Sequence, residues 1–282
     1  PLTGDNAVKN QVYFNCEDEY TSDSKVVKYG DEDYVYKDHC EVWRIIGVFN
    51  TKSSVSDTKE IPRIKIVRDE FTTDMSWDSS SSGDSGKENN SGGGINEWSQ
   101  ADLQSMLNGY YIGVVNATCT YCNGKNQGTC SNDCSSTVTP LSDTALSMID
   151  NALWYTGTTA YADPLPVSIM YTGERGTQNG KICTSGDYCT DTVTRTTTWE
   201  GKIGLIYPSD YAYASTDASC TTNIIAMNST CNTSNWLHPS SGYYWTISPN
   251  PNSERANRIW EVDSSSRVYR GAAFNASGVR PT

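Results

Sequence analysis

The chain has 282 residues, with 33 acidic and 21 basic side chains and a formal net charge of −12. This acidic balance argues against nucleic acid and anionic lipid as partners, because both need a surplus of Lys and Arg on one face. Hydrophobic residues make up 36% of the chain, yet 8 Trp and 18 Tyr can bury enough area to support a core. No apolar stretch is long enough to cross a bilayer, so we expect no membrane insertion.

The N-terminal part predicts an arm followed by a hairpin. Residues 1–40 are polar and acidic, with one β-like stretch at Val12–Phe14. Glu41–Phe49 is almost continuously apolar and predicts a strand that is buried on both faces. Ile61–Asp69 alternates isoleucine with basic residues and predicts a half-exposed strand. We expect these two strands to pair as an antiparallel hairpin.

A loop and two helices are expected next. The Ser, Gly, Asp and Asn content of Ser76–Gly94 predicts a long surface loop. Ser99 can cap a first helix, with Asp102 three residues later as in a capping box. Ser142 can cap a second helix. The apolar faces of these helices are Trp98, Leu103, Met106 and Leu107, and then Ala145, Met148, Ile149, Ala152 and Leu153.

The rest of the chain is β-like and rich in turns. The candidate strands are Pro166–Tyr171, Lys202–Tyr207, Tyr243–Ser248, Arg258–Val262 and Arg267–Gly271. The last two flank Asp263–Ser266, which predicts a hairpin turn. Two helices framed by short strands predict an α+β fold, with 41–282 as a single domain and insert loops at 76–95 and 116–138. We expect one core that contains Trp43, Ile45, Val48, Leu103, Leu107, Ile149, Leu153, Trp245 and Ile259.

Ten cysteines are the strongest compositional signal. They are Cys16, Cys40, Cys119, Cys122, Cys130, Cys134, Cys183, Cys189, Cys220 and Cys231. The even count and the close spacing predict disulfides, an oxidising compartment and a mature secreted chain without its leader. The expected pairs are Cys183–Cys189, Cys220–Cys231 and Cys16–Cys40, whereas the connectivity within 119–134 stays open.

The same cysteine cluster has an alternative interpretation. The spacing Cys119-x2-Cys122-x7-Cys130-x3-Cys134 is tolerable for a tetrahedral zinc site. Oxidation is preferred, because it explains the other six cysteines as well. We therefore expect no metal in this cluster.

Few residues in the sequence indicate a catalytic site. The two histidines, His39 and His238, lie in an acidic segment and before a proline, which is typical of loops rather than of a triad. Clustered carboxylates such as Asp31, Glu32 and Asp33 are typical of solvated acidic loops. Calcium is an alternative ligand of such oxygens, but no spaced Asp loop with a turn glycine is present. We expect no cofactor and no enzyme activity.

Several sequence blocks carry a family resemblance. The ending combines YWTISP at 244–249, RANRIWEV at 255–262 and GVRP at 278–281. Further blocks occur, in order, at 43–49, 64–70, 76–78, 96–103 and 204–211. Together they cover most of the chain and resemble a group of uncharacterised surface proteins of Gram-positive gut bacteria. That group implies a cell-surface location more than an activity.

The ending is also similar, more loosely, to C-type-lectin-like domains of the formylglycine-generating-enzyme type. This similarity implies a twisted antiparallel sheet with two helices and a ligand face built from loops. The enzyme members use cysteines close to this ending, but no cysteine follows Cys231, so that role is not carried over. The calcium-dependent sugar binders use a Pro-Asn pair, present as Pro251-Asn252, and a Trp-Asn-Asp run, which is absent.

In the lectin-like fold the segment from Pro249 to Ala276 would form the ligand face on a rigid sheet. The contact residues that we expect are Arg255, Tyr269, Arg270, Asn252 and Asn275. Arg offers a planar fork of donors and Tyr a rigid amphipathic ring, so both make good anchors. Alternatively, the arginines only pair with local carboxylates, which stabilises exposed pairs little.

The sequence therefore predicts an extracellular protein that binds or assembles. One hypothesis is an adhesin or a pilus-like filament subunit, whose partners are a surface ligand or other copies of itself. Leu2–Asn6 resembles the segment after the hydrophobic helix in Gram-positive pilin-like proteins, and a polar arm could add a strand to a neighbour. The alternative is a monomeric lectin-like module that binds a glycan or a protein. An enzyme is the third hypothesis.

Overall fold

The structure is a computed structural model of the chain, and it describes residues 9–16, 40–79, 93–124, 130–159, 162–176, 196–239, 242–251 and 257–282. Its strands are β1 Gln11–Cys16, β2 Cys40–Thr51, β3 Ile61–Arg68, β4 Asp74–Ser76, β5 Thr120–Tyr121, β6 Asn132–Asp133, β7 Ala152–Tyr155, β8 Thr198–Gly201, β9 Tyr244–Pro249, β10 Arg258–Val262, β11 Val268–Ala272 and β12 Ala276–Gly278. Its helices are η4 Trp98–Gln100, α2 Asp102–Leu107, α3 Asp143–Ser147, α4 Val167–Glu174, α5 Pro208–Tyr213, η5 Ala218–Thr221 and α6 Ser229–Ser234, of which η4 and η5 are 3-10 helices.

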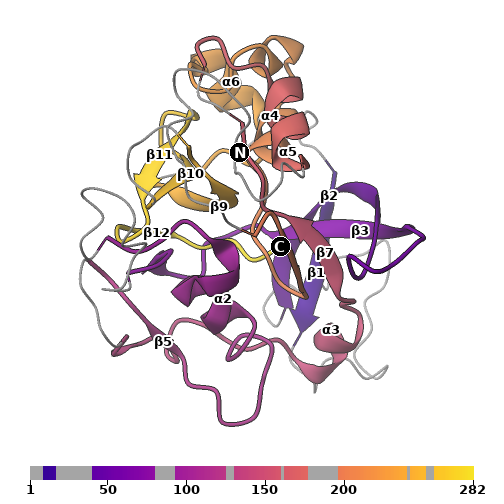
Figure 1. The fold of residues 1–282 in the computed structure, drawn as a ribbon, viewed down its shortest axis with the longest axis vertical. Coiled ribbons are helices and arrows are strands. Elements are labelled where there is room, and N and C mark those ends of the chain that lie inside the picture. Colours follow the sequence, from indigo (N-terminus) through magenta and orange to yellow (C-terminus); the bar gives the residue numbers. More distant parts are fainter. Residues whose placement is uncertain are drawn as a thin grey trace, which may run out of the picture.

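Two sheets organise the described residues. One has three strands in the order β1-β2-β3, and the other has five in the order β11-β10-β9-β12-β4. Helices α4, α5 and α6 gather at one end of the molecule, close to β9, β10 and β11 (Figure 1). Mostly antiparallel sheets with short helices confirm the α+β class.

The N-terminal hairpin is present but differs from its prediction in burial. β2 pairs antiparallel with β3, and β1 pairs with the other edge of β2. β2 is not buried on both faces, because Val48 and Ile64 lie opposite each other and are 66% and 65% exposed. The alternation in β3 is inverted as well, since Lys65 is the side chain that points inward. A β-bulge between Ile45 and Gly47 shifts the register here and changes which residues face the core.

The C-terminal hairpin agrees with its prediction. β10 and β11 pair antiparallel along their whole length, and β9 pairs with the other edge of β10. β12 then pairs parallel with β9 and antiparallel with β4, so the short strand at 74–76 forms an edge of the sheet. The three strands predicted in this region are confirmed to within one residue. The polar turn brings Ser266 to φ 64°, at the position where the chain reverses.

The two predicted helices are shorter than expected. Ser142 caps α3 as predicted, because its Oγ accepts a hydrogen bond from the backbone N of Ala145 at 3.2 Å. The expected continuation of that helix instead forms β7, which pairs with β8. Ser99 does not cap α2, which is a correction. The backbone N of Asp102 donates to Asp78 Oδ1 at 3.2 Å, so the capping group comes from a distant segment.

Two of the predicted strands are wrong. Pro166–Tyr171 belongs to helix α4, whose N-cap residue is Pro166, and the fixed φ of proline suits the start of a helix. The buried residues of α4 recur at helical spacing and are Val167, Met170 and Glu174. Lys202–Tyr207 is not a strand either, because only Leu205 forms an isolated β-bridge, with Pro281.

The predicted surface loop is anchored deep in the protein at both ends. Ser76, Trp77, Asp78 and Ser79 are buried. The Trp77 ring packs 5.3 Å from the Trp98 ring, and its Nε1 donates to the carbonyl of Thr246 at 3.2 Å. Gly94 has φ 72°, and a Cβ there would lie 2.1 Å from the Asp78 carbonyl, so this position needs glycine. The insert expected at 76–95 is therefore not a surface loop at its ends, and 80–92 lie outside the described residues.

The buried side chains form two clusters instead of one core. The first contains five of the predicted core residues, which are Trp43, Leu103, Leu107, Trp245 and Ile259, and Ile149 packs against it. Val48 is exposed and was wrongly placed in the core, while Ile45 and Leu153 lie outside this cluster. The second cluster includes Tyr211, Tyr244, Trp260, Val262 and Val268. Neighbouring residues of β9 and β10 contribute to different clusters, so these two central strands are buried on both faces.

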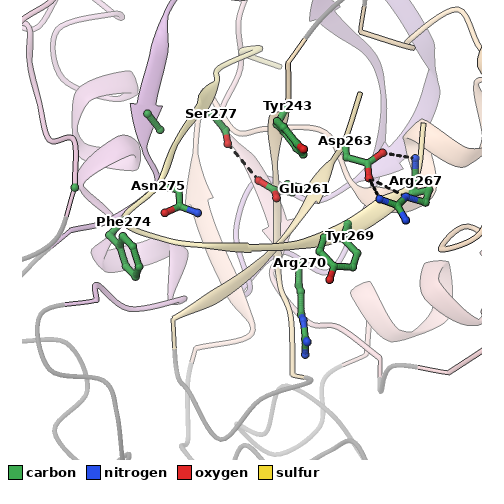
Figure 2. Close-up of a pocket in the computed structure, with 11 residues that line it drawn as sticks. Tyr243, Glu261, Asp263, Arg267, Tyr269, Arg270, Phe274, Asn275 and Ser277 are labelled. Carbon is green, nitrogen blue, oxygen red and sulfur yellow. Dashed lines mark hydrogen bonds and ion pairs between the residues drawn. The ribbon is translucent and has the colours of Figure 1, made fainter. Parts of the chain in front are cut away.

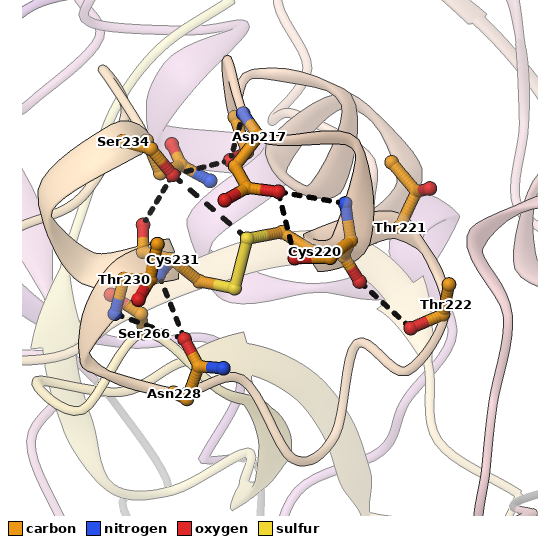
Figure 3. Close-up of a disulfide and its surroundings, with 12 residues drawn as sticks. Asp217, Cys220, Thr221, Thr222, Asn228, Thr230, Cys231, Ser234 and Ser266 are labelled. Carbon is orange, nitrogen blue, oxygen red and sulfur yellow. Dashed lines mark hydrogen bonds between the residues drawn. A yellow bond between two sulfur atoms is a disulfide. The ribbon is translucent and has the colours of Figure 1, made fainter.

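Disulfides hold the irregular segments. Cys16–Cys40 is confirmed, and so is Cys220–Cys231, which Figure 3 shows. Within the cluster the pairs are Cys119–Cys134 and Cys122–Cys130, which contradicts the zinc alternative, because all four sulfur atoms are paired. The described part of the chain contains no free cysteine. Cys183 and Cys189 lie outside the described residues.

The last residues fasten the two sheets together. Arg280 is buried, and its Nε donates to the carbonyl of Arg68 at 2.9 Å while its NH1 donates to the carbonyl of Leu237 at 3.1 Å. Its guanidinium also lies 5.2 Å from the Tyr244 ring centroid. The backbone N of Arg68 donates to the carbonyl of Pro281 at 3.0 Å. The GVRP ending therefore packs inside the protein and presents no contact surface.

Candidate functional site

A groove of about 780 Å3 lies beside strands β10, β11 and β12 (Figure 2). Its lining residues are Gly124, Tyr243, Glu261, Asp263, Arg267, Tyr269, Arg270, Phe274, Asn275, Ala276 and Ser277. Most of them come from the C-terminal strands and the turns between them. A rigid sheet that carries variable turns is a common way to position a binding site.

Three of the predicted contact residues line this groove. They are Tyr269 and Arg270 of β11 and Asn275 of the turn before β12. The other two, Asn252 and Arg255, lie outside the described residues. The structure thus brings together every predicted contact residue that it describes, and their role in binding stays a prediction.

Glu261 lies at the centre of the groove and was missed by the sequence analysis. It pairs with Tyr269 across β10–β11 and with Trp245 across β10–β9, so the three side chains share one face of the sheet. Ser277 Oγ donates to Glu261 Oε2 at 3.2 Å. Burial raises the pKa of this carboxyl from 4.5 to about 7. The sequence feature that could have pointed to Glu261 is an acidic residue between the apolar residues Trp260 and Val262 of a strand.

Gly271 makes room for this carboxyl group. A Cβ at this position would lie 2.5 Å from Glu261 Oε2 and 2.6 Å from a ring carbon of Trp245. Both distances are shorter than real Cβ contacts, so the glycine is needed for close approach rather than for its backbone angles.

The second acidic group of the groove is fully occupied. Asp263 Oδ1 accepts hydrogen bonds from the backbone N of Ser265 at 2.8 Å and from that of Arg267 at 2.9 Å. Asp263 Oδ2 accepts from Arg267 Nε at 2.8 Å. These bonds raise the pKa of the Arg267 guanidinium. The same guanidinium lies 5.4 Å from the Tyr269 ring centroid, so the pair supports that ring.

The side of the groove formed by Gly124 and Phe274 is connected to the disulfide-bonded segment 119–134. The backbone N of Gly124 donates to the carbonyl of Phe274 at 3.0 Å, and Ser76 Oγ donates to the same carbonyl at 2.8 Å. Gly124 follows closely on Cys122, which is bonded to Cys130. The cluster's disulfides therefore hold one wall of the groove in place.

The remaining candidates for chemistry lie away from the groove. His238 does not line it; its Nδ1 lies 2.5 Å from Ser266 Oγ, and burial lowers its pKa. His39 lies outside the described residues, as do the acidic residues 31–33. Across the described ranges, the one cluster with metal-ligand spacing is Asp102 with Cys122 and Cys130. Those two sulfur atoms are bonded to each other, so this cluster is a poor metal site.

No family model, no curated protein and no solved structure matches this chain. Within the described part of the chain, no helix combines the length and the apolar character that a bilayer span requires.

Proposed function

We propose that this chain is an extracellular adhesin-type binding protein that recognises a carbohydrate in the groove. The observation that carries the proposal is the lining, in which Glu261 lies between the rings of Tyr243 and Tyr269 (Figure 2). Tyr243 and Tyr269 are 46% and 40% exposed, so a ligand in the groove can reach both side chains. The disulfides favour the same compartment, since they persist in oxidising surroundings.

The chemistry of the lining suits a ligand that is rich in hydroxyl groups. A sugar ring presents C–H groups on its faces, which pack on a tyrosine ring, and hydroxyls at its edge, which need donors and acceptors. Glu261, Asn275 and Ser277 supply carboxyl, amide and hydroxyl groups for that edge. A volume of about 780 Å3 also lies in the range of small-molecule sites and can take a short oligosaccharide.

Binding fits this groove better than hydrolysis does. Glycoside hydrolysis needs two carboxyl groups, one as an acid and one as a base or nucleophile. Asp263 is saturated by Arg267 and by two backbone donors, so it cannot supply the second group without breaking the turn. Glu261 alone is a hydrogen-bonding group that can donate or accept near neutral pH.

The test is binding to an array of immobilised neutral and acidic oligosaccharides, followed by calorimetry on the glycans that bind. Tyr243→Ala and Tyr269→Ala should each weaken binding by about ten-fold or more, as the loss of an aromatic anchor does. Tyr213→Ala is the matched control, because Tyr213 is 54% exposed and does not line the groove. The proposal fails if no glycan binds, or if the groove variants bind as the parent does.

Self-assembly is a second candidate, favoured by the exposed β2–β3 hairpin. Val48 and Ile64 form an apolar pair across its strands, and Val55 and Ile61 are exposed on the same hairpin. Exposed apolar surface of this kind is typical of contacts between copies. Ordered fibres in negative-stain images, lost in Val48→Ser/Ile64→Ser, would support a filament subunit. Dispersed particles would favour the monomeric binding module.

A further inference from the structure

A buried cluster outside the groove joins three elements that are far apart in sequence. Lys65 of β3 places its Nζ 2.5 Å from Oδ2 of Asp210 in α5. The two side chains are only 14% and 4% exposed. Aromatic rings surround the amine, with the Tyr207 centroid 4.2 Å and the Trp154 centroid 5.2 Å from Nζ. An ion pair in such surroundings has lost most of the hydration that stabilises its charges.

Glu174 of α4 supplies a second carboxyl group to this cluster. It is completely buried, its Oε1 accepts from the backbone N of Ser209 at 2.9 Å, and its Oε2 accepts from the Ser209 hydroxyl. Arg175 NH1 also contacts Glu174 Oε2, at 2.9 Å. Ser209 directly precedes Asp210 in α5, so the residue that binds the Glu174 carboxyl group is the neighbour of the Asp210 carboxyl group.

We propose that Lys65 and Asp210 condense to an intramolecular isopeptide bond, with Glu174 as a positioning residue that holds Ser209, the neighbour of Asp210. In this step a proton passes from the Lys65 ammonium to the Asp210 carboxylate along the hydrogen bond that joins them, and the neutral amine Nζ then attacks Cγ of Asp210. A C–N bond forms, a C–O bond breaks, and the hydroxyl leaves as water with a proton from the amine. The step needs no oxidant, metal or cofactor.

The cluster favours a neutral amine and holds it against the carboxyl group that it would attack. Burial lowers the pKa of the Lys65 amine, which makes it a nucleophile, as in other desolvated lysines. Burial also raises the pKa of Glu174 to about 7, while Arg175 and Ser209 hold its carboxyl group in place. The backbone N of Tyr207 donates to Asp210 Oδ2 at 2.9 Å and fixes the carboxyl group beside the amine. Holding both reactants in contact replaces a bimolecular step with an intramolecular one.

The bond would join segments that no described disulfide connects. Lys65 and Asp210 are 145 residues apart, whereas the described disulfides span 24, 15, 8 and 11 residues. It would link the three-stranded sheet to α5, which packs against β9 and β10 of the other sheet. The proposed bond depends on the Lys65–Asp210 contact alone and not on the groove.

The test is the intact mass of the fully reduced protein. The proposal predicts a mass below that of the sequence by one water, about 18 Da, and a tryptic species that joins the Lys65 and Asp210 peptides. Lys65→Arg keeps the positive charge but removes the nucleophile, so it should have its full sequence mass. Lys202→Arg, the matched control at another lysine, should still lack one water.

Two further variants make the result decisive. In Asp210→Asn the same amide would form with loss of ammonia, so the variant should have the same final mass as the parent. Glu174→Gln should have its full sequence mass, or lose water much more slowly than the parent does. A parent protein at full sequence mass, with trypsin cleaving after Lys65, overturns the proposed bond. Loss of water from Glu174→Gln at the parental rate overturns the role of Glu174.

Discussion

Glu261→Gln should stabilise the protein at neutral and alkaline pH. Burial raises the pKa of Glu261 from 4.5 to about 7, so the folded state holds this proton more tightly than the unfolded state does. Below about pH 4.5 both states are protonated, and the free energy of unfolding has no charge penalty. As pH rises through about 7 the parent loses roughly 3 kcal/mol, since each pKa step of one is worth about 1.4 kcal/mol. Glutamine keeps the shape and does not ionise, so the variant should lose less.

The measurement is urea unfolding with disulfides intact, at several pH values between about 4.5 and 8. The difference between variant and parent should grow with pH and level off above about pH 7. Glu60→Gln is the control, because Glu60 is exposed and should leave the pH dependence unchanged. A difference that stays flat across this range refutes the assignment of a buried, proton-holding Glu261.

Three other perturbations test the fold around the groove. Trp245→Ala should destabilise by about 3–5 kcal/mol in thermal or urea unfolding, because the ring is fully buried. Gly271→Ala should cost about 1–3 kcal/mol from crowding against Glu261 and the Trp245 ring, and replacing Glu261 by Ala as well should recover only part of this cost. Replacing Cys220 and Cys231 by Ser should lower the free energy of unfolding by about 3 kcal/mol, because their disulfide closes a short loop. Thiol titration of the denatured, unreduced parent should find no free thiol. An undiminished melting temperature in either of the first two variants contradicts the packing described above.

Sequence reasoning succeeded where local signals agree with the tertiary structure. The β10–β11 hairpin has apolar strands on both sides of a polar turn, and no distant contact competes with this pattern. The Ser142 cap and the Cys220–Cys231 loop are equally local. Tyr269 was chosen from the lectin-like resemblance instead; it lines the groove, and its role in binding stays a prediction.

The failures come from contacts between distant segments. The alternating pattern of its strand predicts that Lys65 faces the solvent. In the structure it pairs inside the protein with Asp210, which is 145 residues away. Val48 was predicted in the core but is exposed, as is its partner Ile64, because the register of the hairpin shifts between Ile45 and Gly47. Glu261 was missed for a related reason, since its environment depends on Ser277 and Gly271 from two other segments. No pattern within one segment encodes these pairings.

The buried acids of this protein separate into two kinds. Asp78 has its pKa raised to about 7 by burial, and it accepts hydrogen bonds from the backbone N atoms of Ile95 and Asp102, which hold a loop end and cap α2. The free-energy cost of burying Asp78 is therefore offset by the hydrogen bonds with which it holds the loop end and the start of α2. Glu261 has a similar desolvation penalty, yet the hydrogen bond that it accepts comes from the Ser277 hydroxyl and fixes neither a helix end nor a turn. A buried acid that stabilises no local structure and opens on a groove is the kind of group that function retains. This contrast favours Glu261 as the centre of the binding site.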